Sequence, residues 1–85
     1  MSKTFTVRGV KIRTASQRRF VTIAHSWGGN VRVWDYSAER YEDEYRRPFT
    51  EIRKRSNDLG TARKACYAPA HGWCVVIDTV TGEEV

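Results

Sequence analysis

Positively charged side chains interleaved with aromatic rings are the features of this chain most able to do chemistry. The first 34 residues contain seven Lys or Arg and no Asp or Glu, and Trp27, Trp34 and Tyr36 lie among or just after them. Proteins that bind single-stranded nucleic acid use this mixture, because cations bind phosphates and rings stack on bases. A basic β-ribbon can also enter the major groove of a duplex. The candidate contact residues of this segment are Arg8, Lys11, Arg13, Arg18, Arg19, Arg32 and Trp34.

A second basic cluster lies in the second half of the chain. Arg53, Lys54 and Arg55 are consecutive, and Arg63-Lys64 follow them. If this segment is helical, residues 53 and 64 lie about three turns apart on nearly the same side. Arg53, Lys54 and Arg55 are therefore further candidates for phosphate or partner contact. The alternative is that they form the solvated face of an amphipathic helix.

An acidic stretch separates the two basic clusters. Residues 35–51 carry six acids and three bases, and Glu42, Asp43 and Glu44 are consecutive. These three carboxylates form a candidate patch for a basic partner. They could instead repel phosphate, or pair with neighbouring arginines, which would contribute little energy at the surface.

Residues that could hold a metal ion or perform catalysis do not form a recognisable motif. Cys66, His71 and Cys74, with His25 elsewhere, are ligand types that zinc accepts, but their spacing matches no standard zinc finger. Cys74 near His71 is the one nominal nucleophile–base pair, and no third residue orients it. We expect a binding protein rather than an enzyme, with no cofactor, no bound metal and no small-molecule substrate.

Length and composition predict a single domain spanning residues 1–85 with a net charge of +5. A hydrophobic content of 40% is enough for a folded chain. No apolar signal-peptide segment follows Met1, and the longest apolar run, Trp73–Ile77, is far shorter than the ~20 residues that span a bilayer. We expect a cytoplasmic protein with free thiols and no membrane partner.

Four segments are predicted to be β-strands. The alternation of apolar residues changes phase at Gly9, which predicts a strand over residues 4–13 with a bulge there. Further strands are expected over residues 18–25, 31–36 and 73–80. The sequence Trp27-Gly28-Gly29-Asn30 predicts a hairpin turn between the second and third strands.

Two helices are predicted before the last strand. Ser37 is a candidate N-cap of a short helix that ends at Pro48. Apolar residues then step by three or four, which predicts an amphipathic helix over about 50–67 that Gly60 interrupts or caps. The order β-β-β-α-α-β predicts an α+β fold, with a small antiparallel sheet and helices packed on one face. We place the last strand beside the first. The predicted core, between helix and sheet, is Phe49, Ile52, Leu59, Val75 and Ile77.

Part of the basic segment resembles the three-stranded AP2-type DNA-binding sheet. The residues that carry the resemblance, all within residues 5–36, are Val7-Arg8-Gly9-Val10-Lys11, Arg13 and Arg32-Val33-Trp34. The resemblance implies that Arg and Trp side chains on strands read the major groove. Asp35-Tyr36 departs from the family pattern, where a Gly is expected, and Pro48 interrupts the segment that follows. The chain is therefore not assigned to this family.

These patterns lead to one expected function and one alternative. The expected function is a small basic module that contacts nucleic acid through its N-terminal strands. The alternative is an inhibitor of the phage or mobile-element type, similar in size to anti-CRISPR proteins. Such an inhibitor would bind a nucleic-acid-handling protein complex through its charged patches.

Overall fold

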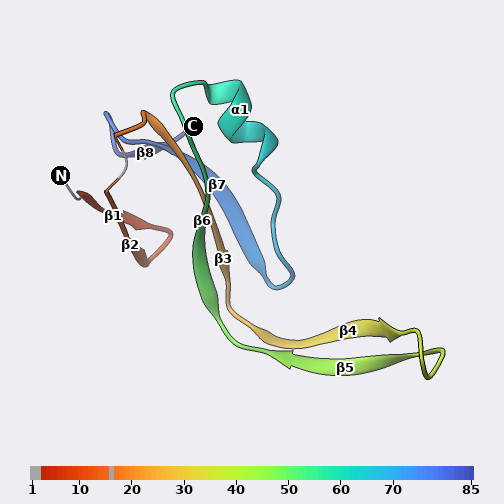
Figure 1. The fold of residues 1–85 in the computed structure, drawn as a ribbon. Helices are drawn as coiled ribbons and strands as arrows, with labels where there is room; N and C mark the ends of the chain where they lie inside the picture. Colours follow the sequence, from red (N-terminus) through yellow and green to blue (C-terminus); the bar gives the residue numbers. More distant parts are fainter. Residues whose placement is uncertain (1–2, 16) are drawn as a thin grey trace.

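The computed structural model describes residues 3–15 and 17–85, and it is mostly β (Figure 1). Strands hold 59% of these residues and helix holds 7%. In chain order the elements are β1 (Lys3–Val7), β2 (Val10–Thr14), β3 (Phe20–Ser26), β4 (Gly29–Asp35), β5 (Arg40–Arg46), β6 (Phe49–Ser56), α1 (Leu59–Lys64), β7 (Gly72–Asp78) and β8 (Glu83–Glu84). The predicted α+β fold, with helices packed on one face of a sheet, is wrong, because the described chain forms several small antiparallel sheets and one short helix.

The larger part of the molecule is a four-stranded antiparallel sheet with the elements that cover it. We call this part the body. The strand order of the sheet is β6-β3-β7-β8. The β1–β2 hairpin packs on one face and α1 packs on the other (Figure 1). The second part, which we call the arm, is the two-stranded ribbon of β4, β5 and their turn, residues 29–46. The arm projects away from the body, so the molecule is elongated, with extents of 49 × 24 × 19 Å.

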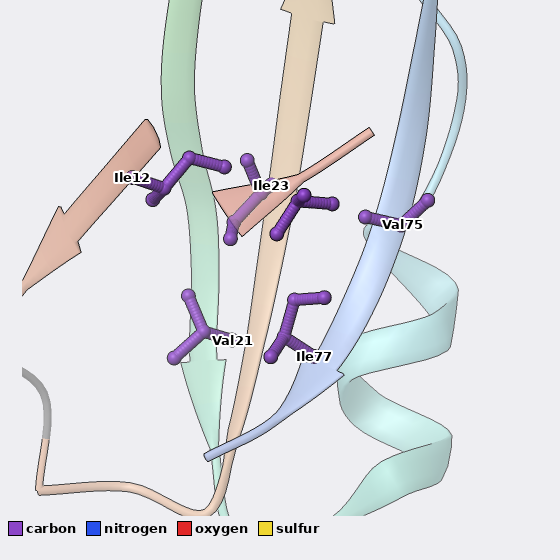
Figure 2. Close-up of a cluster of buried hydrophobic side chains, with 6 residues drawn as sticks. Ile12, Val21, Ile23, Val75 and Ile77 are labelled. Carbon is purple, nitrogen blue, oxygen red and sulfur yellow. The ribbon is translucent and has the colours of Figure 1, made fainter. Parts of the chain in front are cut away.

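The main core lies between the sheet and the β1–β2 hairpin. Aliphatic side chains from β2, β3 and β7 gather there (Figure 2), among them Ile12, Val21, Ile23, Val75 and Ile77. Val75 and Ile77 are buried as predicted, but they lie on the face of the sheet that packs against the β1–β2 hairpin, so their predicted place between helix and sheet is wrong. Ile52 and Leu59 are only partly buried, and Phe49 is 39% exposed, so its predicted place in the core is wrong.

The central strand β3 is buried along its whole length because α1 covers its other face. Phe20 of β3 and Val76 of β7 pack there against Ala62, with Leu59 partly buried beside them. The hydroxyl of Thr22 donates a hydrogen bond to the carbonyl of Ala62 at 2.7 Å, which satisfies a polar group inside this layer.

The first predicted strand is a hairpin rather than a single bulged strand. β1 and β2 pair antiparallel, with Val7 opposite Val10. The connection is Arg8-Gly9, and both residues have positive φ, +49° and +82°. Two consecutive positive φ values are the geometry of a type I′ turn, whose twist matches that of the flanking strands. Gly9 therefore permits a turn and not a bulge.

The strand pairing also departs from the predicted neighbours. β7 pairs with β3, so the predicted placement of the last strand beside the first is wrong. The segments that resemble the AP2-type sheet do not form one sheet either, because β1 pairs with β2 and β4 pairs with β5.

Strands β3 to β6 form one long, bent hairpin. Ser26 pairs with Phe49 and Gly29 pairs with Arg46, so residues 27–28 and 47–48 face each other at an elbow between the body and the arm. Gly28 has a φ of +74° there, and a Cβ atom would lie 2.5 Å from the carbonyl oxygen of Arg46. The glycines predicted to close a tight hairpin instead let the ribbon bend and continue.

The two predicted helices before the last strand are mostly strand. The first falls on the tip turn, residues 36–39, and on β5. In that turn the carboxylate of Asp35 accepts hydrogen bonds from the N–H groups of Ser37 at 2.9 Å and Ala38 at 3.2 Å. The second is replaced by β6 and α1. Residues four apart, such as Tyr41 and Tyr45, share a face in a strand as well as in a helix, so their spacing did not distinguish the two.

The short helix α1 begins at a side-chain cap. The carboxylate of Asp58 accepts hydrogen bonds from the N–H of Thr61 at 2.9 Å and from its hydroxyl at 2.6 Å. These hydrogen bonds lower the pKa of Asp58, the hydroxyl bond contributing most. Gly60 lies in the first turn, so the predicted C-cap or mid-helix break at this glycine is wrong.

Low pH is expected to destabilise the body, because it protonates Asp78 and so removes the ion pair between Asp78 and Arg19. The Arg19 guanidinium lies 3.0 Å from the carboxylate, and the N–H of Val80 donates to the same carboxylate at 2.9 Å. These hydrogen bonds hold the pKa of Asp78 below its ordinary value of 3.8, and the one from Arg19 contributes most. Because the folded pKa lies below the unfolded one, this stabilisation is present above about pH 4 and is lost as the pH falls through the folded pKa.

In wild type, the free energy of unfolding should decrease as the pH is lowered from about 5 to about 2. In the variant Asp78→Asn this decrease should be smaller. Urea denaturation at each pH measures this slope. Arg19→Gln removes the same interaction from the other side and should give a similar flattening. A wild-type slope in Asp78→Asn would contradict the assignment.

Candidate functional site

Three of the predicted contact residues come together in one open groove on the body. Lys11 and Arg13 of β2 and Arg55 of β6 line it, and its volume is about 470 Å³. Ile12 and Ile52 also line it, and of the two Ile52, which is only partly buried, supplies the apolar surface. Lys11 and Arg13 alternate with the buried Ile12, so the two cations leave the same side of β2, about 7 Å apart along the strand. The fold thus joins the two basic clusters that the sequence keeps apart.

The three cations of this groove are not neutralised by any residue in the described part of the chain. Glu51 also lines the groove, but its carboxylate lies 3.0 Å from Nε of Arg53 and is paired with that side chain. Within residues 3–15 and 17–85, the side chains of Lys11, Arg13 and Arg55 have no hydrogen-bond or ion-pair partner. The groove therefore offers three cations to an anionic ligand.

Two other predicted cations are engaged within the body. Nε of Arg8 lies 3.0 Å from the carboxylate of Glu84, and its guanidinium lies 5.5 Å from the ring centroid of Trp73. Arg19 pairs with the buried Asp78. The hydrogen bonds to these two carboxylates raise the pKa of both guanidinium groups. Arg8 and Arg19 therefore tie the N-terminal half of the chain to its C-terminal end.

The three consecutive cations of β6 do not act as one stripe. Arg53 is the extra residue of a β-bulge in the pairing of β6 with β3. Its guanidinium lies 3.8 Å from the ring centroid of Tyr67 and donates to the Tyr67 carbonyl, while Arg55 lines the groove. Lys54 is exposed and does not line it. Arg18 precedes β3, and its carbonyl accepts a hydrogen bond from Thr79 at 3.1 Å.

The remaining two predicted residues, Arg32 and Trp34, lie on the arm. The Trp34 ring contacts Tyr41 edge-on, with 5.0 Å between centroids, and contacts Tyr36 at 6.4 Å. The Arg32 guanidinium lies 5.7 Å from the centroid of Tyr41. Strand alternation and these contacts place one set of side chains on the same side of the arm. We call this side the aromatic face, and its residues are Arg32, Trp34, Tyr36, Tyr41, Asp43 and Tyr45.

The predicted acidic patch is divided between the two faces of the arm. Glu42 pairs with Arg40 at 2.9 Å and Glu44 pairs with Arg46 at 3.1 Å, all on the face opposite the aromatic face. Internal pairing, one of the sequence-based alternatives, therefore describes Glu42 and Glu44. Asp43 lies on the aromatic face and has no side-chain partner within the described part of the chain.

The arm itself is the functional candidate that sequence reasoning missed. Part of its signal was present, because Val31, Val33 and the aromatic residues Trp34, Tyr41 and Tyr45 flank a polar turn, and such residues are enriched in strands. A candidate N-cap at Ser37 led to a helix prediction and concealed the hairpin. Only the pairing of β4 with β5 brings Trp34 opposite Tyr41.

The cysteines and histidines form no candidate metal centre among the described residues. No group of three or more His, Cys, Asp or Glu side chains lies close enough there to hold a metal ion. Burial raises the pKa of Cys74 to about 11, and a hydrogen bond with Cys66 contributes to the shift. The Cys74 thiol is therefore protonated at neutral pH and is a poor nucleophile.

Comparisons of the chain with protein-family models, with curated proteins and with solved structures found no match. No helix in the described part of the chain is long and apolar enough to cross a membrane. The case for function rests on the groove and the arm.

Proposed function

We propose that this chain is a small, non-enzymatic module that binds nucleic acid through the groove between β2 and β6. The observation that carries the proposal is the set of three unpaired cations, Lys11, Arg13 and Arg55, in that groove. Unpaired Arg and Lys side chains bind phosphate oxygens through charge-assisted hydrogen bonds. The partly buried Ile52 offers apolar surface to the sugars of the same ligand.

The shape of the groove favours a polymer over a small anion. The groove is open to solvent and does not enclose a small ligand, so a bound polymer can extend beyond it. The spacing of about 7 Å between Lys11 and Arg13 along β2 is comparable with that of successive phosphates in a single strand. Arg55 then contacts the backbone from the opposite wall.

The overall charge distribution favours the same ligand. The arm has three bases and five acids, a net charge of −2, so the remainder of the chain carries +7. A body of this charge attracts polyanions and increases their encounter rate. The acidic arm repels them, which favours an approach to the body.

The inhibitor alternative has less support. It required Glu42, Asp43 and Glu44 to face a basic groove of a partner protein. Glu42 and Glu44 already have arginine partners on the same strand, so a partner would have to displace both ion pairs. Nucleic-acid binding by the body needs no such exchange.

Removing the groove cations should weaken nucleic-acid binding and its dependence on salt. Each neutralised phosphate of a single strand contributes about −0.7 to the slope of log K against log salt. The triple variant Lys11→Ala/Arg13→Ala/Arg55→Ala should therefore bind a labelled oligo-thymidine more weakly, with a slope about 2 units shallower than wild type. Fluorescence anisotropy over a salt series measures both quantities, and a random duplex tests strand preference.

A matched control removes the same charge elsewhere on the body. Lys54→Ala/Arg63→Ala/Lys64→Ala also lowers the net charge by three, and none of these residues lines the groove. This variant should keep a slope close to that of wild type. Equal losses in both triple variants would show that diffuse charge, and not the groove, attracts the ligand. A wild-type protein with no binding at low salt would overturn the proposed function.

A further inference from the structure

The arm exposes an aromatic surface that no segment among residues 3–15 and 17–85 covers. Tyr36 is 86% exposed, Tyr45 is 69% exposed and Tyr41 is 60% exposed. A two-stranded ribbon with no third layer is marginally stable in water. Tyr, Trp and Arg are also the residue types that contribute most to protein–protein interfaces. The aromatic face is therefore suited to packing against another protein surface.

The charges on this face indicate what kind of surface would fit. Arg32 and Asp43 sit directly opposite each other on β4 and β5. They form no ion pair in the described structure, since Arg32 lies against Tyr41 and Asp43 has no partner. The face thus holds one cation and one unpaired anion side by side among aromatic rings. A strongly basic partner would repel Arg32, and a strongly acidic partner would repel Asp43.

A second copy of this chain satisfies both charges at once. We propose that the aromatic face is a homodimer interface, covered by the aromatic face of a second copy related by a two-fold axis along the arm. This axis lays β4 of each copy over β5 of the other. Each Arg32 then faces Asp43 of the other copy, and each Trp34 faces the other Tyr41, because these residues are cross-strand partners. An interface between two identical patches must be self-complementary in this way.

The proposed dimer places two basic bodies at the same end of the paired arms. Each body carries +7, and their mutual repulsion opposes association. At 0.15 M salt the Debye length is about 8 Å, so this repulsion is largely screened between surfaces further apart. The dimer should therefore form more readily at physiological salt than at low salt.

A charge-exchange experiment tests the interface and its symmetry. Sedimentation equilibrium of the full chain at physiological salt, over a micromolar to millimolar range, measures the dimerisation constant. Arg32→Asp and Asp43→Arg each place like charges opposite one another in a homodimer, so each should weaken dimerisation by roughly tenfold or more. An equimolar mixture of the two variants brings opposite charges together at both contacts. It should re-form a dimer, and native mass spectrometry should identify it as the mixed species.

The matched controls lie on the opposite face of the arm. Arg40→Asp and Glu42→Arg make the same charge changes at an ion pair that faces away from the interface, and both should dimerise like wild type. Recovery in the mixture also excludes misfolding as the cause of monomer formation. A wild-type chain that stays monomeric would overturn the proposal, as would a mixture that stays monomeric. Weakened oligonucleotide binding by Arg32→Asp with unchanged self-association would assign the face to base stacking instead.

Discussion

Replacing Ile77 with alanine is expected to lower the free energy of unfolding by about 2–5 kcal/mol, the usual range for deleting a buried aliphatic side chain. Ile77 is 1% exposed and packs in the main core with side chains of β2 and β3. An 85-residue domain has little stability to spare, on the order of 0.1 kcal/mol per residue. The variant should therefore be partly unfolded at moderate temperature. Urea denaturation followed by tryptophan fluorescence measures the loss.

Leu59→Ala is the matched comparison for this prediction. Leu59 is partly buried at the edge of the smaller cluster under α1, so its neighbours and solvent can fill the space more easily. Its loss of stability should be clearly smaller than that of Ile77→Ala. A loss below about 1 kcal/mol for Ile77→Ala would contradict the packing described for β7.

The second large effect is expected at Gly72, where β7 begins. An added Cβ atom would overlap the carbonyl oxygen of His25 and lie 2.8 Å from Cα of Ser26, both in the backbone of β3. Backbone atoms cannot move aside as a flexible side chain can, so the two central strands would have to separate. Gly72→Ala should therefore destabilise the protein by about 3 kcal/mol, the upper part of the range for overpacking.

Gly60→Ala is the control, because the same chemical change there meets open space. The nearest atom to its added Cβ is Asp58 Oδ2 at 3.4 Å, and the residue lies in α1. The substitution should stabilise the protein by up to about 1 kcal/mol, since alanine favours the helix and restricts the unfolded chain. Thermal unfolding followed by circular dichroism should move the two variants in opposite directions. A neutral Gly72→Ala would mean that β3 and β7 pair less closely than described.

Strands whose pattern is local could be predicted from the sequence, and those that depend on a distant partner could not. The predicted strands 18–25, 31–36 and 73–80 overlap β3, β4 and β7, since β-branched and aromatic residues concentrate there. Most of β6 falls in the helix predicted over about 50–67, because apolar residues recur there at helical spacing. Pairing with β3 outweighs that local preference. The turn at Arg8-Gly9 needed a positive φ at an arginine, which sequence patterns do not reveal.

In the candidate site, too, the local pattern could be predicted and the contacts between distant segments could not. Sequence reasoning correctly found unusual cation clusters in residues 1–34 and 52–64, but it could not show that Lys11 and Arg13 would line a groove with Arg55. The proximity of these three side chains depends on how the β1–β2 hairpin lies against β6. The sequence also could not separate Arg55 from Arg53, because a bulge in β6 directs Arg53 toward Tyr67.

The central position of β3 has a consequence for how the chain folds. β3 and β6 belong to one hairpin that can zip from the tip turn toward the body, and hairpin formation takes about 1–10 μs. β7 joins from far along the chain, since Phe20 pairs with Asp78, so its docking is the non-local and slower step. Until β7 docks, β3 has an unpaired hydrogen-bonding edge of strongly apolar sequence. Newly made or refolding chains at high concentration should therefore aggregate through this edge, and dilute refolding should favour the native fold.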